Sequence, residues 1–416
     1  PSLVQTTAHY NNPDATLIRL LDLLDTIGRR ESYLALLAEH PQALKRLADL
    51  YSASPWVSEY LTRHPVLLDE LLDFRLLHQI PEWQQLGGDL RQELAELGND
   101  TEAKMDSLRH FQHTQIFRLV LQDLAGLLPL EKLSDHLSDL ADLILAVTVE
   151  QVWQDLPKKH REQPQFAIIG YGKLGGKELG YASDLDIVFL YDDMDANAAD
   201  IYARFAKRVV MWLTSTTSAG QLYDIDLRLR PNGSSGLLVS SIAAFAQYQR
   251  ASAWVWEHQA LSRARFCTGD AEIGRQFSLI RCEILRQTRN SEALRQEVQT
   301  MRDKMLETHP ALPQDVKHVR GGIVDIEFIV QYLILAHAST IQALTANLGN
   351  IALLETAAQH DLISQEAANH ARQAYRALRR LQHQCRLTGT ELDVAMLAPL
   401  SDDLAAVRET WLQLFD

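Results

Sequence analysis

The sequence predicts an α+β fold that is mostly helical, with one small mixed sheet between N-terminal helices and a C-terminal helical bundle domain. Apolar residues recur at helical spacing over most of the first 156 residues and again after residue 271. Runs with the shorter period of strands are confined to residues 166–240. At 416 residues the chain exceeds the usual size of a single core, so two or three domains are expected.

Three regions are predicted along the chain. Residues 1–105 form an N-terminal helical region, residues 106–265 a domain that carries the strands, and residues 266–416 a C-terminal helical domain. In the first region, leucines at helical spacing predict helices over 14–73, and Pro and Gly residues predict a loop over 81–88.

The composition limits the classes of function. Acidic residues outnumber basic ones by 54 to 40, and the formal net charge is −14. Because nucleic-acid binding depends on neutralising phosphates, a nucleic-acid partner is disfavoured. No apolar run approaches the length of a membrane span and no secretory leader opens the sequence, so we expect a cytoplasmic protein without a membrane partner. The cysteines Cys267, Cys282 and Cys385 lack metal-site spacing, which predicts reduced, buried thiols.

Long helices are predicted over 101–156, directly before the strands. His110 and His113 lie one turn apart there. Since no third ligand is near, a solvated helix face explains them better than a metal site does.

A glycine-rich connection between two short apolar runs is the main functional signal. Residues 166–169 and 187–191 are predicted as buried strands, and the glycines between them would let backbone N–H groups approach a polyphosphate. Asp184 and Asp186 stand at the start of the second strand, so their side chains point to the same face. Two carboxylates held in this way suit Mg²⁺, which binds carboxylates and substrate phosphates.

Three other interpretations compete for this stretch. Gly170 begins a match to G-x-G-x-x-G, with Asp192 about 20 residues later, as in dinucleotide-binding units. Such a unit needs a full crossover helix between its strands, and the segment before Asp184 is too short for one. A Walker A loop fails because neither Lys173 nor Lys177 has the required neighbours. The last alternative is a solvated acidic turn, and a third acid argues against it.

That acid is Asp226. Residues 222–229 alternate between charged and apolar side chains, which predicts a strand with Asp226, Arg228 and Arg230 on one face. Asp226 can complete a three-carboxylate metal site with Asp184 and Asp186. Arg228 and Arg230 could hold phosphate oxygens, because guanidinium groups match phosphate bidentately.

The later elements are predicted from the same helical and strand periodicities of apolar residues. We predict a helix over 200–216, a third strand over 237–240 and a helical region from residue 254. Only helices are predicted from residue 271 to the end.

A very apolar helix in this last part carries Asp325 and Glu327. A buried acid needs a partner, which we expect to be Arg320 or a group of the strand-bearing domain.

Four ordered segments give the chain a family resemblance. They are GYGKLGGKELGYASDLDIVFLYD, YDIDLRLRPNGSSGLLV, WEHQALSRAR and GGIVDIEF. The Gly-Gly turn, the D-x-D and the later acid resemble the nucleotidyltransferases related to DNA polymerase β. From about residue 56 to its end, the chain resembles the bifunctional glutamine synthetase adenylyltransferase/adenylyl-removing family, and within it the C-terminal adenylyltransferase half. Family members carry two such halves in tandem and this chain has one, so we expect it to be a fragment.

The resemblance implies a chemistry for the site. AMP would pass from ATP to a tyrosine hydroxyl of glutamine synthetase with release of pyrophosphate, and the PII signal protein and glutamine would be regulators. Asp184, Asp186 and Asp226 would hold two Mg²⁺ ions about 3.5–4 Å apart, with Asp226 on the acceptor side as general base or metal ligand. The residues expected to bind the triphosphate are Gly175, Gly176, Lys177, Ser183, Arg228 and Arg230.

Other functions stay open at this point. The opposing activity of the family, phosphorolytic deadenylylation, belongs to its N-terminal half. A non-catalytic half that senses PII or glutamine is disfavoured because all three acids are present. A small-molecule nucleotidyltransferase of the antibiotic-modifying type would be more compact than this chain.

Overall fold

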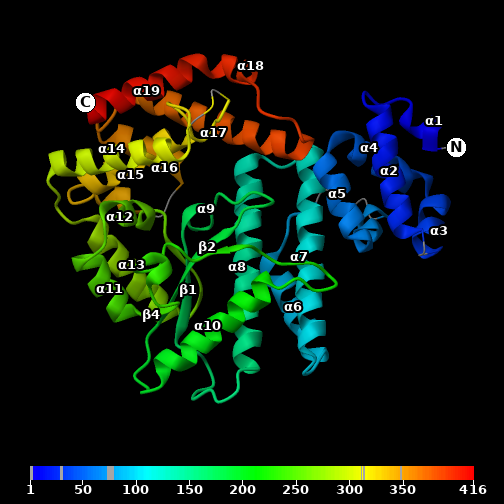
Figure 1. Ribbon diagram of the computed structural model, residues 1–416, viewed down its shortest axis with the longest axis horizontal. Coiled ribbons are helices and arrows are strands. Elements are labelled where there is room, and N and C mark those ends of the chain that lie inside the picture. The colour runs from blue at the N-terminus through cyan, green and yellow to red at the C-terminus, as the bar shows by residue number, and fades with distance from the viewer. Residues whose placement is uncertain (1–2, 29–30, 73–78, 311, 313, 347–348) are drawn as a thin grey trace. The chain divides into compact units, whose positions relative to one another are not determined.

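The computed structural model describes residues 3–28, 31–72, 79–310, 312, 314–346 and 349–416 (Figure 1). They belong to two compact units, and the chain passes between them at several points, the first of them within helix α8, Leu130–Gln154. Unit 1 comprises Pro1–Leu140, Thr217–Gly220 and Leu381–Glu391, and unit 2 comprises Ala141–Thr216, Gln221–Arg380 and Leu392–Asp416. This division does not follow the three regions expected from the sequence, whose bounds stay a prediction.

Helices make up most of unit 1. Three of the α-helices described there begin at a proline, Pro13, Pro41 or Pro55, a position that needs no N–H donor. Ser54 caps one of these helices by accepting the N–H of Val57 at 3.1 Å. The helices are α1 Leu3–Thr7, α2 Pro13–Ile27, α3 Glu31–Glu39, α4 Pro41–Ala53, α5 Pro55–Arg63, the 3₁₀ helix η1 Pro65–Leu72, α6 Trp83–Glu96 and α7 Thr101–Leu124.

The helical predictions for 14–73 and 101–156 are confirmed over the described residues. The loop predicted over 81–88 is wrong, because α6 runs through it. Leu90 and Leu94 of α6 are buried, and a side chain at Gly88 would meet no atom within 4 Å. Packing of the apolar side of α6 therefore outweighs the low helix propensity of its glycines.

The solvated face predicted for His110 and His113 is half right. His110 is exposed, whereas His113 is buried and its Nδ1 lies 2.7 Å from the hydroxyl of Tyr60. The ring of His113 stacks on that of His64 at 3.8 Å between centroids. Burial, followed by the neighbouring His64, lowers the pKa of His113 to about 3, so the pair is uncharged at neutral pH.

Within the described residues, the named strands lie in unit 2 and form one five-stranded sheet, whose strands β1, β2 and β4 are labelled in Figure 1. Their order is β3-β2-β1-β5, and β4 also pairs with β2. β1 runs antiparallel to β2 and β5, whereas β2 runs parallel to β3 and β4, which confirms the small mixed sheet. The strands are β1 Phe166–Gly170, β2 Leu185–Tyr191, β3 Ile225–Asp226, β4 Val239–Ser241 and β5 Arg265–Gly269.

Two strand predictions are corrected. The alternation over 222–229 yields only the two-residue β3, because a turn follows it. β5 is absent from the sequence-based predictions, yet it pairs with β1 across a register shift. The antiparallel pairing of β1 and β2, joined through the single-turn helix α9, Gly172–Gly175, also excludes a dinucleotide-binding unit, which needs parallel strands.

One face of the sheet is covered by aromatic side chains. Phe166 and Phe189 stack at 5.5 Å between ring centroids, and Phe205 of α10, Ala198–Thr214, lies 4.8 Å from Phe166. Trp153 of α8 packs on Phe205 at 5.0 Å. Each such side chain contributes roughly 1.5–3 kcal/mol by leaving water. The predicted helix over 200–216 is confirmed as α10.

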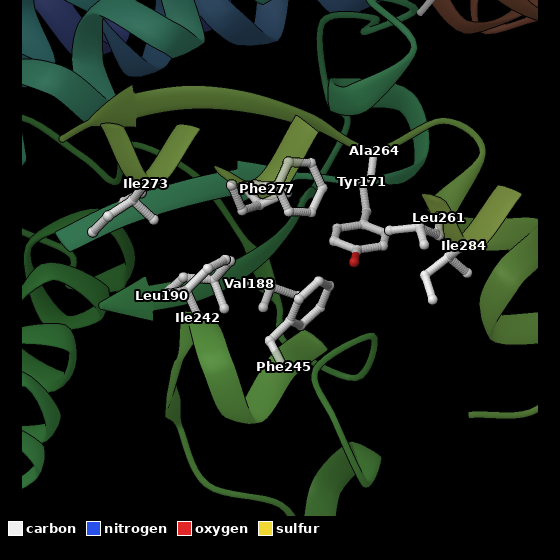
Figure 2. Packing of buried hydrophobic residues seen from close by; sticks show 12 residues of the cluster. Tyr171, Val188, Leu190, Ile242, Phe245, Leu261, Ala264, Ile273, Phe277 and Ile284 are labelled. Atoms are coloured by element: carbon white, nitrogen blue, oxygen red, sulfur yellow. The ribbon is translucent and has the colours of Figure 1, made fainter. Parts of the chain in front are cut away.

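The opposite face carries the core shown in Figure 2. Val188 and Leu190 of β2 pack with Phe245 of α11, Ile242–Ala251, and with Phe277 of α13, Ala271–Leu285. Side chains alternate along a strand, so residues 184 and 186 point to this same face. The two predicted site acids are therefore placed just beyond one end of a packed core.

Several further helices of unit 2 pack against α15, Ile323–His337, whose apolar residues are nearly all buried. Asp325 pairs with Arg302 at 2.6 Å, and not with Arg320, while Glu327 pairs with Arg263 at 2.6 Å. The helical prediction after residue 271 is confirmed for the described residues. The helices of the described residues not yet given are α12 Val255–Leu261, α14 Ser291–Thr308, α16 Asn350–Gln359, α17 Gln365–Thr388, α18 Val394–Leu397, α19 Ser401–Phe415 and the 3₁₀ helices η3 Gly233–Ser235, η4 Gln342–Thr345 and η5 Ala398–Leu400.

Over the described ranges, no helix combines the length and apolarity needed to cross a membrane. The three cysteines are free, as expected, but half-buried instead of fully buried.

Candidate functional site

Asp186 and Asp226 lie opposite each other on neighbouring strands. In the parallel pairing of β2 with β3, Asp186 is the register partner of Asp226. The N–H of Leu185 donates to the carbonyl of Asp224 at 2.9 Å and so ties the start of β2 to β3. Asp184 directly precedes β2 and is exposed. Three carboxylates from two distant segments thus gather where two parallel strands begin.

The charges of these acids act on one another. Burial raises the pKa of Asp186 to about 6, with a further contribution from the negative charges of Asp184 and Asp226. The positive charges of Lys173 and Arg228 offset part of this rise in the pKa of Asp186. Carboxylates crowded in this way favour a bound cation, and oxygen ligands are those that Mg²⁺ prefers.

Arg228 pairs with Asp226. Its Nε lies 3.0 Å from Oδ1 and 2.7 Å from Oδ2, and its backbone N–H donates to Oδ1 at 2.8 Å. The hydrogen bonds from Arg228 lower the pKa of Asp226. In this arrangement no three His, Cys, Asp or Glu side chains of the described residues are placed to hold one metal ion. Asp226 would have to leave Arg228 to complete the predicted three-carboxylate site.

Arg230 supports the loop that follows β3. Its guanidinium donates to the carbonyls of Leu227 at 2.7 Å, Ser234 at 3.0 Å and Gly236 at 3.3 Å. Its charge also helps to lower the pKa of Asp226. The arginine is thus engaged with backbone oxygens, and binding of phosphate by it stays a prediction.

The turn Gly175–Gly176 packs on Arg263. A Cβ on Gly175 would lie 2.2 Å from the carbonyl oxygen of Arg263, and one on Gly176 would lie 2.6 Å from its guanidinium. The N–H groups of these two glycines donate to carbonyls of the same turn at 2.8 and 3.1 Å, and that of Lys177 donates at 3.2 Å. These donors are engaged within the turn in this structure, and binding of the β- and γ-phosphates by Gly175, Gly176 and Lys177 stays a prediction.

Ser183 closes the turn before Asp184. Its hydroxyl accepts the N–H of Gly180 at 3.0 Å, and its own N–H donates to the carbonyl of Gly180 at 3.1 Å. The turn fixes the backbone from which Asp184 projects. A contact of Ser183 with phosphate stays a prediction.

Two residues of the site were missed by the sequence reasoning. Gly172 has a φ of +51°, and a Cβ there would lie 2.2 Å from Oδ2 of Asp186, so only glycine leaves room for that carboxylate. Lys173 is close enough for its charge to act on Asp184 and Asp186. Both residues lie in the first turn of α9, one residue beyond β1, but neither a positive φ nor this proximity can be recognised in the sequence.

Comparisons with known proteins identify the family of the chain. A family model described as "Glutamate-ammonia ligase adenylyltransferase" matches residues 44–279, and one described as "GlnD PII-uridylyltransferase" matches residues 289–407. Relatives named "Bifunctional glutamine synthetase adenylyltransferase/adenylyl-removing enzyme" include one from Chromobacterium violaceum, 60% identical over 416 residues, and one from Neisseria meningitidis serogroup A, 54% identical over 418. Each alignment covers 100% of this chain and 46% of the relative, so the chain spans about half the length of the curated relatives it matches.

Proposed function

This chain belongs to the glutamate-ammonia ligase adenylyltransferase family, and we propose that it transfers AMP from ATP to a tyrosine hydroxyl of glutamine synthetase, releasing pyrophosphate. The observation that carries the proposal is the register pairing of Asp186 with Asp226 beside Asp184. Three carboxylates that converge at the ends of two paired strands can hold the metal ions and the metal-bound phosphates on which nucleotidyl transfer depends.

The finer fold that we propose is a DNA polymerase β-like nucleotidyltransferase domain. Its support is the order of elements in unit 2. A glycine turn in α9 follows β1, two acids stand at the start of β2, and a third acid lies on the neighbouring β3. A mixed sheet of this size with helices on both faces is consistent with that domain.

The donor set fits Mg²⁺. Asp184, Asp186 and Asp226 offer only carboxylate oxygens. Burial raises the pKa of Asp186, and the charges of Asp184 and Asp226 add to this rise, which nearby basic groups offset only in part. These three side chains would hold the metal once Asp226 is released from Arg228. When bound, Mg²⁺ would neutralise the triphosphate and lower the pKa of the acceptor hydroxyl.

The protein side chains have separate roles in the proposed reaction. The tyrosine oxygen forms a bond to the α-phosphorus of ATP, while the bond from that phosphorus to the oxygen of the leaving pyrophosphate breaks. Asp226, on the acceptor side, takes up the hydroxyl proton. Lys173, Lys177 and Ser183 bind the β- and γ-phosphates, and Arg228, turned away from Asp226, offsets charge that develops in the transition state.

The direction of transfer is part of the proposal. The segments GYGKLGGKELGYASDLD and YLTRHPVLLDELL resemble the adenylyltransferase half of the family, which supports addition of AMP. The alternative is phosphorolytic removal of AMP from the same tyrosine by the same acids. We also propose PII and glutamine as regulators, and the match of residues 289–407 to a PII-uridylyltransferase model supports PII.

Mass spectrometry of glutamine synthetase tests the proposal. One sample of unmodified glutamine synthetase receives this chain with ATP, Mg²⁺ and glutamine, and a parallel adenylylated sample receives the chain with phosphate. Gain of AMP on a tyrosine in the first sample is expected. Loss of AMP in the second would reverse the direction, and no change in either would favour a sensor half.

A double substitution tests the site itself. Asp184→Asn with Asp186→Asn should abolish transfer, because both metal-binding carboxylates are lost, while the thermal midpoint stays unchanged or rises. Asp224→Asn is the matched control, because Asp224 is exposed and lies in the neighbouring segment. Transfer that survives the double change would show that the site is elsewhere.

A further inference from the structure

A buried polar cluster centres on Glu178, the second residue after the glycine turn. The side chain of Glu178 is 9% exposed and forms an ion pair with the guanidinium of Arg263. Its Oε2 also accepts the hydroxyl of Tyr375 at 2.7 Å, and its backbone carbonyl accepts Arg379 at 2.9 Å. Tyr375 and Arg379 belong to α17, so this glutamate is held by a helix far away in the sequence.

Further contacts complete the cluster. The other end of the Arg263 guanidinium donates to Glu327 of α15 at 2.6 Å. The amide of Asn350, at the start of α16, donates to the hydroxyl of Tyr375 at 2.8 Å. Two arginines and two glutamates therefore balance in charge around one buried tyrosine, the condition under which buried ions are tolerated.

The electrostatics agree with this pairing. Burial alone would raise the pKa of Glu178, but Arg263 and Arg379 outweigh it and hold that pKa below its ordinary value. Burial and the charges of Glu178 and Glu327 raise the pKa of Tyr375 well above its ordinary range. The tyrosine thus stays protonated and donates its hydrogen bond at any working pH.

The cluster is connected to the site acids through α9. The N–H of Glu178 donates to the carbonyl of Lys173 at 2.7 Å. Arg263 is the residue on which both glycines of the turn pack, and neither glycine could carry a Cβ without displacing it. At the other end of the same turn, Gly172 lies against the carboxylate of Asp186. A shift of the turn would therefore move a basic group and a metal-binding acid together.

We propose that Glu178, Arg263 and Tyr375 are positioning residues, through which α15, α16 and α17 hold the α9 turn so that Lys173 and Asp186 are placed for binding Mg²⁺ and ATP. The three residues need not contact the nucleotide. This inference rests on the proposed nucleotidyl transfer, and it gives the C-terminal helices a direct part in that site.

Tyr375→Phe is the test substitution, because it removes one buried hydroxyl and keeps the ring. Loss of a hydrogen bond to a charged group leaves Glu178 less restrained, and we expect the Kd for ATP with Mg²⁺, measured by calorimetry, to rise about tenfold. Hydrogen exchange of peptides covering residues 172–182 should also become faster, since the N–H groups of Gly175, Gly176 and Glu178 are bonded within that turn.

Tyr332→Phe is the matched control, because Tyr332 is a buried tyrosine of α15 that packs on Phe415. It should change neither the Kd nor the exchange of residues 172–182. Glu178→Gln is the second variant if Tyr375→Phe does not fold, and it should act in the same direction. Wild-type affinity together with wild-type exchange in the test variant would overturn the proposal.

The two readouts separate this inference from the proposed function. If the wild-type chain binds no ATP, the proposed function fails, and the exchange comparison alone decides the positioning role. Faster exchange of residues 172–182 in Tyr375→Phe than in Tyr332→Phe then supports that role, and equal exchange overturns it.

Discussion

Replacing Asp186 by Asn should stabilise the metal-free protein. The pKa of Asp186 is about 6 in the folded chain, against an ordinary value of 3.8, because of burial and of the charges of Asp184 and Asp226. One pKa unit corresponds to about 1.36 kcal/mol, so the ionised carboxylate lowers the free energy of unfolding by about 3 kcal/mol at pH 8. Asn keeps the shape of the side chain and removes its charge, so the free energy of unfolding of the variant should rise by up to that amount.

The gain in the free energy of unfolding of Asp186→Asn should depend on pH. The folded chain keeps a proton on Asp186 up to about pH 6, whereas the unfolded chain releases it near pH 3.8. The cost of the charge therefore grows as the pH rises between these two values and is complete above them. At pH 5 the difference between variant and wild type should be roughly half of that at pH 8.

Urea unfolding followed by circular dichroism in EDTA, at pH 8 and pH 5, measures this difference. Asp224→Asn is the control, because Asp224 is exposed and its carboxylate accepts a hydrogen bond from Gln221 at 2.8 Å. Asp224→Asn should change the free energy of unfolding by no more than about 0.5 kcal/mol. Added Mg²⁺ should stabilise the wild type more than Asp186→Asn, since it binds the intact acids. An Asp186→Asn variant no more stable than the control at pH 8 would refute the reasoning.

Three further substitutions follow from the same geometry. Gly172→Ala should lower AMP transfer at least about tenfold in an initial-rate assay, because its Cβ would lie 2.2 Å from a site carboxylate. Arg228→Ala should leave the free energy of unfolding within about 0.5 kcal/mol, since the side chain is 78% exposed, and should tighten Mn²⁺ binding severalfold in a paramagnetic resonance titration by releasing Asp226. Arg302→Met should cost about 3–5 kcal/mol in urea unfolding, because it leaves Asp325 buried without its ion-pair partner.

Each of these three predictions has an outcome that would contradict it. Gly88→Ala, where a Cβ meets nothing within 4 Å, is the control for Gly172→Ala and should leave transfer unchanged. Equal transfer rates in the two variants would mean that the Gly172 contact is unimportant. Weaker Mn²⁺ binding by Arg228→Ala, or a loss below about 1 kcal/mol for Arg302→Met, would count against the corresponding ion pair.

The parts of the site that could be predicted depend on local patterns. β1 and β2 are apolar runs bounded by polar or glycine-rich segments, and the D-x-D at the start of β2 fixes a common face for Asp184 and Asp186. The third acid was recognisable because charged and apolar residues alternate around Asp226, although only two of those residues form a strand.

The parts that could not be predicted depend on contacts between distant segments. Arg230 is one more charged residue in an alternating run, and only the folded loop shows the three carbonyls that it binds. Tyr375 follows Glu178 by 197 residues, so no spacing in the sequence connects them. The strand β5 depends on pairing with β1, because its residues are half-buried or exposed and give a weak apolar pattern.

The acids of the site are carried by strands of different length. Asp186 is carried by a strand of 7 residues in the middle of the sheet, whereas Asp226 ends a strand of 2 residues with a loop after it. Short pairings at a sheet edge open more readily than central ones. Under the proposed function, a protein acceptor that docks on the loop after β3 would therefore complete the site as it binds. The AMP group of bound ATP would then not be transferred to water before the acceptor binds.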